Sequence, residues 1–523
     1  MTITRRSLLS SAAAVPPTVA LAAGMPDPAA AAASAAAGKN VLIFITDQER
    51  RLRHFPEGWE EEHLPGLTRL KRHGVTFENA FANACMCSPS RATLLTGLYP
   101  AQHGVKYTLE EDMPAEEYPQ VELPTDVENV ATVMTAAGYE VVFKGKWHLS
   151  KPLAADGTWT PEDLAQYGFG GWNPPDGGAN QDISQAGGGV TDHDGRFMNG
   201  EQGVLEFLAS RGEDSPPWCM IVSLINPHDL LFYPGPRNAS PPKYVQAGYL
   251  PEDGWFEGEV GLPVTWDEDL STKPDAQQRF ARIFKLAGAP NTREERLGYV
   301  NFYGNLMKLV DGYLVDILDR LTETGQLEDT IVIRTADHGE MGLAHTMQQK
   351  NFNFYEETLN VPLVYSNPEL FPEPRTSRQL VSHVDLLPTL AGLAEVPTAA
   401  RSADWRGVDY SRHLLGPGAG PTQDHVVFTY DDIQAGQKSG PYVRPPNRIV
   451  AVREKRWKLA RYYDAAGQQP DQWEMYDLVK DPLERRNLAH RPGRMTRAQR
   501  AQFRRLKKRI ARVEKTTLAP LDA

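Results

Sequence analysis

Four short apolar segments, each followed by polar residues and then by a helix-like stretch, constrain the fold of this chain most strongly. They are rich in β-forming apolar residues and comprise residues 41–46, 141–144, 219–224 and 331–334. Buried strands that alternate with helices are typical of a parallel α/β architecture. We therefore predict an α/β fold with a large mixed, mostly parallel sheet flanked by helices.

Polar side chains that can carry chemistry stand directly after each of these segments. In parallel sheets, ligands collect at the carboxyl ends of the strands. One polar pair at a strand end is usually a loop group or a helix cap, whereas four such pairs at one edge of a sheet predict a common site. The pairs are Asp47 and Gln48, Lys146 and His148, Asn226 and His228, and Asp337 and His338.

Two regions rich in Gly, Pro and polar residues, 151–200 and 231–290, show no clear periodicity. Such stretches predict long surface insertions, which can serve as lids. Helical periodicity returns over residues 305–324 and 385–394. Pro, Gly and Ala between residues 396 and 421 then predict a linker.

After this linker the pattern changes to that of a small α+β unit. Residues 426–430, 449–453 and 457–462 are predicted strands, and the last two are close enough for a hairpin. A basic helix is predicted over residues 497–514, and we interpret it as a solvated amphipathic helix rather than a docking surface. The predicted parts of the chain are a leader over residues 1–38, a catalytic domain over 39–400 and a C-terminal subdomain with an antiparallel sheet and a terminal helix over 401–523.

The leader has the features of an export signal. Arg5 and Arg6 precede an Ala-rich apolar run, and Ala20-Leu21-Ala22 offers a cleavage site. The paired arginines indicate the twin-arginine route, so we predict a periplasmic or secreted protein; a disordered Ala-rich leader is the alternative. No later segment reaches the roughly 18 apolar residues that a membrane span needs, so none is predicted.

Charge and cysteine content exclude several classes of protein. The net charge of -12 argues against a general nucleic-acid binder, because affinity for a phosphate backbone comes from Lys and Arg. Any anion site must therefore be local. The three cysteines, Cys85, Cys87 and Cys219, cannot form a disulfide framework and match no paired zinc-ligand spacing.

Residues 87–91, Cys-Ser-Pro-Ser-Arg, predict an anion site at the start of a helix. Pro89 suits the first helical position and Gly97 suits the end, so Cys87 is expected at or just before the N-cap. Free backbone N–H groups and the positive end of the helix dipole favour an anion there, and Arg91 adds a cation one turn into the helix. A sulfate or phosphate group suits such a site.

Two of the strand ends form a candidate metal site. Asp47, Gln48, Asp337 and His338 offer two carboxylates, an amide oxygen and an imidazole. This mostly hard ligand set suits Ca²⁺, with Mn²⁺ and Mg²⁺ as alternatives. Such a cation would polarise the oxygens of a bound anion and orient the nucleophile.

Several separate stretches resemble the signatures of the type I sulfatases. Residues 87–97 carry Cys-x-Pro-x-Arg with a Thr-Gly helix end, and residues 138–149 resemble the second signature of that family. Residues 40–48 and 337–340 resemble its two metal-binding strands, and residues 473–488 its C-terminal domain. The resemblance covers nearly the whole mature chain. It implies an alkaline-phosphatase-like fold and hydrolysis of a sulfate monoester to an alcohol and sulfate.

The resemblance also implies a cofactor, a modification and partners. Cys87 would be converted to formylglycine (3-oxoalanine) by a formylglycine-generating enzyme during maturation, and the hydrate of this aldehyde would be the nucleophile. The substrate would be a sulfated small molecule or a carbohydrate. The residues implied as ligands of the divalent metal are Asp47, Gln48, Cys87, Asp337 and His338.

Five further residues have catalytic roles by this resemblance. Arg91 and Lys146 would stabilise the hydrate and the sulfate charge, and His148 would take the proton that drives elimination. His228 and Lys350 would bind the sulfate and protonate the departing alcohol oxygen.

Departures from the family pattern leave alternatives open. Many members carry Asp-Asp and Asp-Asn where this chain has Asp47-Gln48 and Asp337-His338, a combination closer to phosphonate monoester hydrolases and choline sulfatases of the same superfamily. A phosphonate monoester hydrolase or phosphodiesterase is therefore the alternative function, and a catalytically inactive binding protein is a third. His345 is either a residue that positions the site or an ordinary core histidine.

Overall fold

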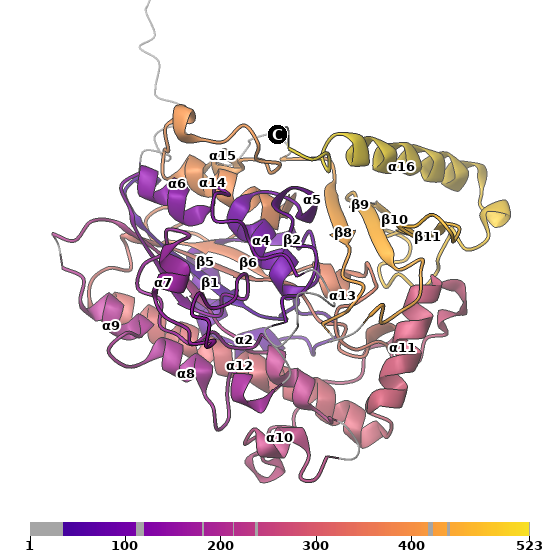
Figure 1. Ribbon diagram of the computed structural model, residues 1–523, viewed down its shortest axis with the longest axis horizontal. Helices are drawn as coiled ribbons and strands as arrows, with labels where there is room; N and C mark the ends of the chain where they lie inside the picture. Colours follow the sequence, from indigo (N-terminus) through magenta and orange to yellow (C-terminus); the bar gives the residue numbers. More distant parts are fainter. Residues whose placement is uncertain are drawn as a thin grey trace, which may run out of the picture.

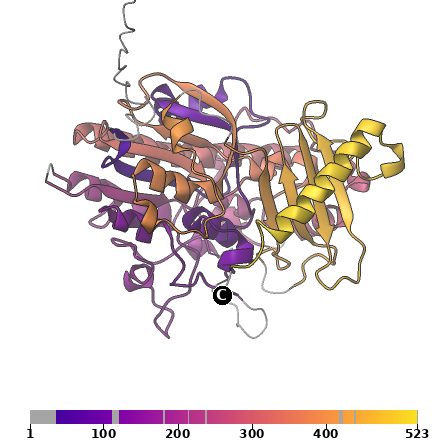
Figure 2. The same ribbon diagram turned by 90° about the horizontal axis from the view of Figure 1, so that it is seen from above.

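The computed structural model describes residues 35–110, 120–179, 182–212, 214–235, 239–416, 422–436 and 440–521 (Figure 1). Almost all of the predicted export leader, residues 1–38, lies outside these ranges. Within them, no helix combines the length and the apolar character needed to cross a membrane. The described chain forms a large sheet between two layers of helices and a smaller sheet beside it (Figures 1 and 2).

The large sheet has seven strands and is mixed. Parallel pairing joins β3 to β4, β4 to β1, β1 to β5 and β2 to β7, whereas β6 runs antiparallel to both of its neighbours. The predicted mostly parallel sheet is therefore confirmed. In spatial order the strands are β3 (Glu140–Gly145), β4 (Trp218–Ser223), β1 (Asn40–Thr46), β5 (Thr330–Ala336), β6 (Leu363–Ser366), β2 (Gly74–Phe81) and β7 (Arg375–Ser382).

Alternate residues of β1, an interior strand of the sheet, face two different cores. Val41, Ile43 and Ile45 pack into one core, and Leu42 and Phe44 pack into the other. Both faces are buried because helices cover each of them, as is usual for parallel strands. The first core is covered by α4 (Cys87–Thr96), α6 (Val130–Ala136), α14 (Leu386–Leu393) and α15 (Ser411–Leu415), and the second by α3 (Pro65–Arg72), α8 (His193–Met198), α9 (Val204–Ala209) and α12 (Arg293–Glu323).

The sequence predicted β1, β3, β4 and β5 but not β2, β6 or β7. Strand β6 is only four residues long, and β7 carries exposed polar residues along its first half, so neither has a clear apolar pattern. Helix α12 begins at Arg293 rather than at residue 305. Its start is marked by a capping box between Thr292 and Glu295 that the sequence prediction overlooked.

The smaller sheet is antiparallel, with strands in the order β11, β10, β9, β8. Helix α16 lies across its outer face (Figure 2), where Leu506, Ile510 and Val513 pack, and Phe280 of α11 belongs to the core on its inner face. The three predicted strands and the terminal helix are thus confirmed. The elements are β8 (Val426–Tyr430), β9 (Arg448–Arg453), β10 (Trp457–Tyr463), β11 (Gln472–Asp477), α11 (Asp275–Ala287) and α16 (Arg497–Lys515).

The predicted linker and insertions are more closely packed than expected. Tyr410 and Leu414, inside the predicted linker, are buried in the core of the large sheet. Trp172, inside the insertion over residues 151–200, is buried as well. Single large apolar residues anchor these irregular segments, which is why the absence of periodicity was misleading. The division of the chain at residue 400 stays a prediction.

Candidate active site

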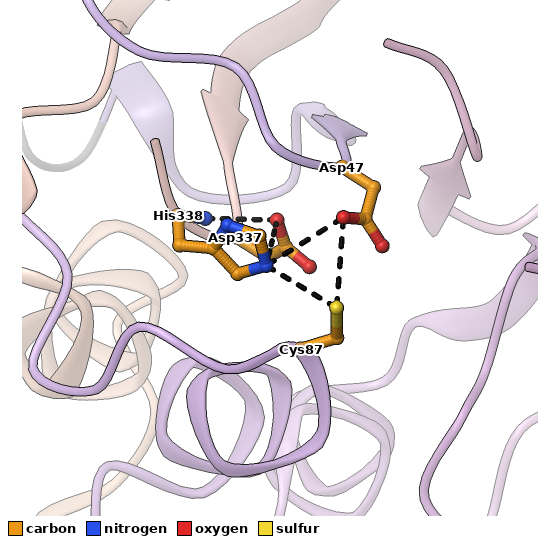
Figure 3. A group of neighbouring side chains, drawn as sticks. All are labelled: Asp47, Cys87, Asp337 and His338. Atoms are coloured by element: carbon orange, nitrogen blue, oxygen red, sulfur yellow. Dashed lines mark hydrogen bonds and ion pairs between the residues drawn. The ribbon is translucent and has the colours of Figure 1, made fainter. Parts of the chain in front are cut away.

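The ends of β1 and β5 bring two of the predicted polar pairs to the start of α4. Ligand atoms of Asp47, Cys87, Asp337 and His338 all lie within 4.8 Å of one another, and all four residues are buried (Figure 3). Asp47 follows β1, whereas Asp337 and His338 follow β5, and these strands are hydrogen-bonded neighbours. Parallel pairing therefore places parts of the chain that are far apart in sequence around a common point.

Helix α4 begins at Cys87, earlier than predicted. Met86 is the N-cap residue, and its carbonyl accepts the first intrahelical hydrogen bond from the backbone N–H of Ser90 at 3.0 Å. Cys87 is therefore the first helical residue, and Pro89 lies within the first turn. The predicted end is confirmed, because Gly97 is the C-cap with a φ of 67°. All residues of α4 are buried, so the field of its N-terminus acts on the site with little screening by water.

Two buried cations hold the carboxylates: Arg91 bridges Asp47 and Asp337, and Lys146 binds Asp47. Arg91 Nε donates to Asp337 Oδ2 at 3.0 Å, and Arg91 Nη2 donates to Asp47 Oδ2 at 3.1 Å. Lys146 Nζ donates to the same oxygen of Asp47 at 2.5 Å and to the carbonyl of Gly178 at 2.6 Å. Each charge is thus paired, as buried charges must be.

These contacts move the pKa values of the site in different directions. Burial alone would raise the pKa of Asp47, but the charge of Lys146 and smaller contributions from other neighbours hold it well below its usual value. Burial, together with the charge of Asp47, raises the pKa of Asp337 to about 7. The same two causes raise the pKa of Cys87 to about 12. An unmodified thiol at this position would therefore stay protonated at neutral pH.

The four clustered side chains fit a divalent cation. His338 Nδ1 lies 3.0 Å from the carbonyl of Gly339 and must donate to it, so Nε2 carries a lone pair that faces the cluster, 3.2 Å from Cys87 Sγ, and that a metal could use. This Nε2 lies 3.6 Å from Oδ1 of Asp47 and 3.6 Å from Oδ1 of Asp337. Ligands about 2.4 Å from a Ca²⁺ ion can lie up to ~4.8 Å apart across it, so the spacing of this group suits such an ion.

Gln48, the fifth predicted ligand, has a different environment. Its Oε1 accepts a hydrogen bond from Lys350 Nζ, and its Nε2 donates to Glu340 Oε2 at 2.7 Å and to Gln349 Oε1 at 3.2 Å. Its backbone N–H donates to Asp337 Oδ1 at 3.0 Å. The φ of 70° at Gln48 is strained for a residue other than glycine. Gln48 therefore links Lys350 to the carboxylate cluster.

Asp176, from the insertion that follows β3, fixes the backbone that carries His148. Its carboxylate accepts from the backbone N–H of Trp147 at 2.8 Å and of His148 at 2.7 Å. His148 Nε2 donates to the carbonyl of Leu109 at 2.7 Å, so Nδ1 carries no proton, and within the described ranges Nδ1 has no hydrogen-bond partner. Burial and the nearby Lys146 charge hold the pKa of His148 well below its usual value. A neutral imidazole with a free lone pair can serve as a general base.

Four of the predicted catalytic residues line a narrow cavity of about 50 Å³. Arg91 and Lys146 are not among its described lining residues, because both are engaged with the carboxylates. Phe284 and Ala435 extend the lining toward the smaller sheet. The predicted catalytic residues that line it are Cys87, His148, His228 and Lys350.

The loop that carries His228 is held by two buried aspartates. Asp229 accepts from the backbone N–H groups of Gly187 at 3.0 Å and Gly188 at 2.9 Å. Asp194 accepts from two backbone N–H groups of the loop before His228, at 2.6 and 2.9 Å. Gly187, Gly188 and Asp194 belong to the insertion over residues 151–200. This insertion therefore helps to build the site rather than only covering it.

The surroundings of His345 support one of the two interpretations left open for it, an ordinary core histidine. Its ring stacks on Tyr355 with centroids 3.8 Å apart, and its Nδ1 lies 2.7 Å from Glu268 Oε2. Ser223, which the prediction missed, accepts from Arg91 Nη1 at 2.6 Å. The other residues that it missed are Asp176, Asp194 and Asp229, for which the only sequence signal was a Pro-Pro-Asp-Gly-Gly turn around Asp176.

Comparison with known families gives two matches. The family model described as Sulfatase matches residues 39–396, and the one described as N-sulphoglucosamine sulphohydrolase, C-terminal, matches residues 344–515. Delta 4,5-hexuronate-2-O-sulfatase of Bacteroides thetaiotaomicron is 27% identical to this chain, over 82% of it and 79% of the relative. Choline-sulfatase of Rhizobium meliloti is also 27% identical, over 87% of this chain and 83% of the relative.

Solved structures share the fold. The structure of a 2-O GAG sulfatase has a TM-score of 0.66 at 22% identity and covers 92% of this chain and 94% of its own. Phosphonate monoester hydrolase of Agrobacterium radiobacter has a TM-score of 0.60 at 19% identity, with 92% and 96% covered. At these identities the likeness is one of fold.

Proposed function

This chain belongs to the sulfatase family and is a sulfatase enzyme, and we propose that it hydrolyses a sulfate monoester by a formylglycine-dependent reaction. The observation that carries the proposal is the placement of Cys87 at the N-terminus of α4, within ligand distance of Asp47, Asp337 and His338. A sulfate group bound there would meet the field of a buried helix N-terminus.

The environment of Cys87 supports its conversion to formylglycine. A protonated, buried thiol is a poor nucleophile, and the raised pKa of Cys87 keeps it in that form. Addition of water to the formylglycine aldehyde would give a hydrate with two hydroxyl groups on one carbon, one to attack sulfur and one to expel sulfate afterwards as the aldehyde re-forms. We infer that a formylglycine-generating enzyme makes this change during maturation.

The residues that would hold the divalent metal are Asp47, Asp337, His338 and the oxidised side chain at position 87. Gln48 stays a proposed ligand, because an amide oxygen has two lone pairs and Lys350 uses one of them. Bound there, the metal would act as a Lewis acid toward sulfate oxygens. The carboxylate-rich set favours Ca²⁺, with Mn²⁺ and Mg²⁺ as alternatives.

The chain's own side chains would divide the proton transfers. His148, with an unprotonated Nδ1, would accept the proton released when sulfate is expelled. His228 and Lys350 line the same cavity as His148, and we assign them to the sulfate and to protonation of the departing alcohol oxygen. Arg91 and Lys146 would act mainly through the carboxylates that they hold in place.

Export remains part of the proposal. The paired arginines Arg5 and Arg6 support transport by the twin-arginine route to the periplasm or the exterior. This route carries folded proteins and would suit a site that is modified first. We also keep the proposed division into a catalytic domain over residues 39–400 and a subdomain over 401–523.

A phosphonate monoester hydrolase on the same scaffold is the second candidate. The pairs Asp47-Gln48 and Asp337-His338 favour it, and the fold of a phosphonate monoester hydrolase resembles this one. A sulfate monoester and a phosphonate monoester each carry one negative charge near neutral pH, so they differ in the central atom and its substituents rather than in charge.

The discriminating experiment measures kcat/KM for an aryl sulfate and for the matching aryl phosphonate monoester on one purified sample. We expect the sulfate to be hydrolysed with the higher kcat/KM. The leaving group is the same in both substrates, so a difference in kcat/KM reports on the sulfate or phosphonate group alone. A clear preference for the phosphonate would replace the first proposal by the second.

Asp176→Asn tests the role of the insertion in the site. The amide of asparagine places its own N–H₂ donor against one of the backbone N–H groups that donate to Asp176. That backbone group loses its hydrogen bond, which costs about 1–3 kcal/mol of unfolding free energy. Displacement of His148 should lower kcat roughly 10–100-fold, a typical loss when a group that orients an active-site residue is removed. Chemical denaturation and aryl sulfate turnover measure the two effects.

The matched control is Asp156→Asn, an exposed aspartate of the same insertion that accepts from the backbone N–H of Thr158. It should leave kcat unchanged. Equal kcat losses in the two variants would show that Asp176 has no special place in the site.

A further inference from the structure

The C-terminal part of the described chain is strongly basic, although the protein as a whole is acidic. Residues 485–515 contain thirteen Lys or Arg residues against one Asp or Glu, whereas the whole chain has a net charge of -12. This segment runs from the loop after β11 through α16, which lies across the outer face of the smaller sheet (Figures 1 and 2). Such a local excess of positive charge attracts anions to this face.

A cavity of about 550 Å³ lies between the loop and residues 268–272. Within the described part of the chain, no hydrogen bond or ion pair engages the guanidinium groups of the arginines that line it. Its two acidic lining residues are already engaged: Glu268 pairs with Lys273, and Asp269 bonds Ser271. Guanidinium groups match the oxygens of sulfate in pairs. The lining arginines, all exposed, are Arg485, Arg486, Arg491 and Arg494.

Helix α16 continues this basic surface along its solvent face. Leu506, Ile510 and Val513 bury the opposite face of the helix against the sheet. The basic residues that lie between the two faces are paired, since Arg505 and Arg509 both bind Glu454. Like charges three or four residues apart destabilise a helix, and a bound polyanion would relieve that repulsion. The exposed basic residues that recur at this spacing are Arg497, Arg500, Arg504, Lys508, Arg512 and Lys515.

We propose that the cavity and the solvent face of α16, together called the basic groove, bind an extended sulfated polysaccharide. This proposal replaces the interpretation of the helix from sequence alone as only a solvated amphipathic helix. A helix of 19 residues is roughly 28 Å long, which exceeds the reach of a small sulfate ester. A ligand that engages both parts must therefore carry repeated anionic groups along a chain. The inference rests on the proposed function, because it makes the basic groove a holding site for a polymeric substrate of the same enzyme.

The composition of the basic groove separates this ligand from an anionic membrane. Peripheral helices that bind bilayers insert large apolar side chains beside their basic residues. The large hydrophobic residues that are exposed in the described chain all lie outside residues 485–515. The apolar side chains of α16 pack against the sheet and are not available for insertion into a bilayer. A polysaccharide, which needs charge and no insertion, fits the basic groove better.

The test measures binding of the full chain to dextran sulfate, with unsulfated dextran as the uncharged probe. Two double variants remove two charges each: Arg491→Gln with Arg494→Gln in the cavity, and Arg504→Gln with Lys508→Gln on the helix. Each pair should weaken binding roughly tenfold at low salt and reduce the slope of log affinity against log salt by about 2. Turnover of a small aryl sulfate should be unchanged in both.

The matched control is Arg72→Gln with Arg293→Gln, which removes two exposed charges from other helices. It should change dextran sulfate affinity by less than twofold. Equal losses in control and groove variants, absence of binding, or tighter binding of duplex DNA or of anionic lipid vesicles would overturn the proposal. Binding does not need turnover: a chain that binds dextran sulfate through the groove but hydrolyses no aryl sulfate refutes only the proposed function.

Discussion

Cys87→Ala should lower kcat for an aryl sulfate by roughly 10⁴-fold or more, as expected when the nucleophile of an enzyme is removed. Alanine keeps the helical start at position 87, and the four cations and anions around it stay paired, because Arg91 and Lys146 bind the carboxylates rather than the sulfur. The effect should therefore fall on turnover and not on folding. Steady-state kinetics and thermal unfolding of the same sample measure both.

Cys219→Ala is the matched control, since Cys219 is a buried cysteine on β4 in the core of the large sheet. It removes a thiol of the same chain and should retain kcat, with a loss of about 1 kcal/mol of unfolding free energy from the missing sulfur. Peptide mass spectrometry of the wild-type protein from its native host should show position 87 as formylglycine. Near wild-type turnover of Cys87→Ala, or a position 87 found only as thiol, would contradict the proposed nucleophile.

How far the sequence alone could lead is clearest at the strand ends. The runs that became β1 and β5 are mostly apolar, so both their burial and the position of Asp47 and Asp337 at one edge of the sheet follow from local pattern. The start of α4 was misplaced by two residues, because Pro89 is accepted anywhere in the first turn and does not by itself mark the first residue.

The residues that hold the site in position could not be predicted in the same way. Three aspartates hold the site by accepting hydrogen bonds from backbone N–H groups of other segments: Asp176, Asp194 and Asp229. Such contacts leave no periodic pattern in the sequence. Their environment is set by tertiary packing of an irregular insertion. Gly145 shows the same limit: its φ is 101°, and a Cβ there would lie 2.0 Å from the carbonyl of Ser223, so only the fold explains the glycine.

Asp47→Asn should remove both metal-dependent stability and turnover. Asp47 is fully buried and accepts hydrogen bonds from Lys146 and Arg91, so the substitution leaves two buried cations with one carboxylate, Asp337. Breaking a buried ion pair in this way costs about 3–5 kcal/mol of unfolding free energy. With a proposed ligand of the metal also gone, kcat should fall roughly 10³-fold, a loss comparable to removal of a strong electrostatic stabiliser.

Calcium titration during chemical denaturation separates the two parts of this effect. The unfolding free energy of the wild type should rise by about 2.7 kcal/mol when the Ca²⁺ concentration reaches a hundred times its dissociation constant. That of Asp47→Asn should not change over the same range. Asp311→Asn is the matched control, because Asp311 is a buried aspartate that accepts backbone N–H groups of Gly66 and Leu67 at 2.7 and 2.8 Å, away from the site. It should lose stability but keep the calcium gain and kcat. If Asp47→Asn kept the calcium gain, Asp47 would be a partner of Lys146 and Arg91 alone, and the divalent cation would have to bind elsewhere.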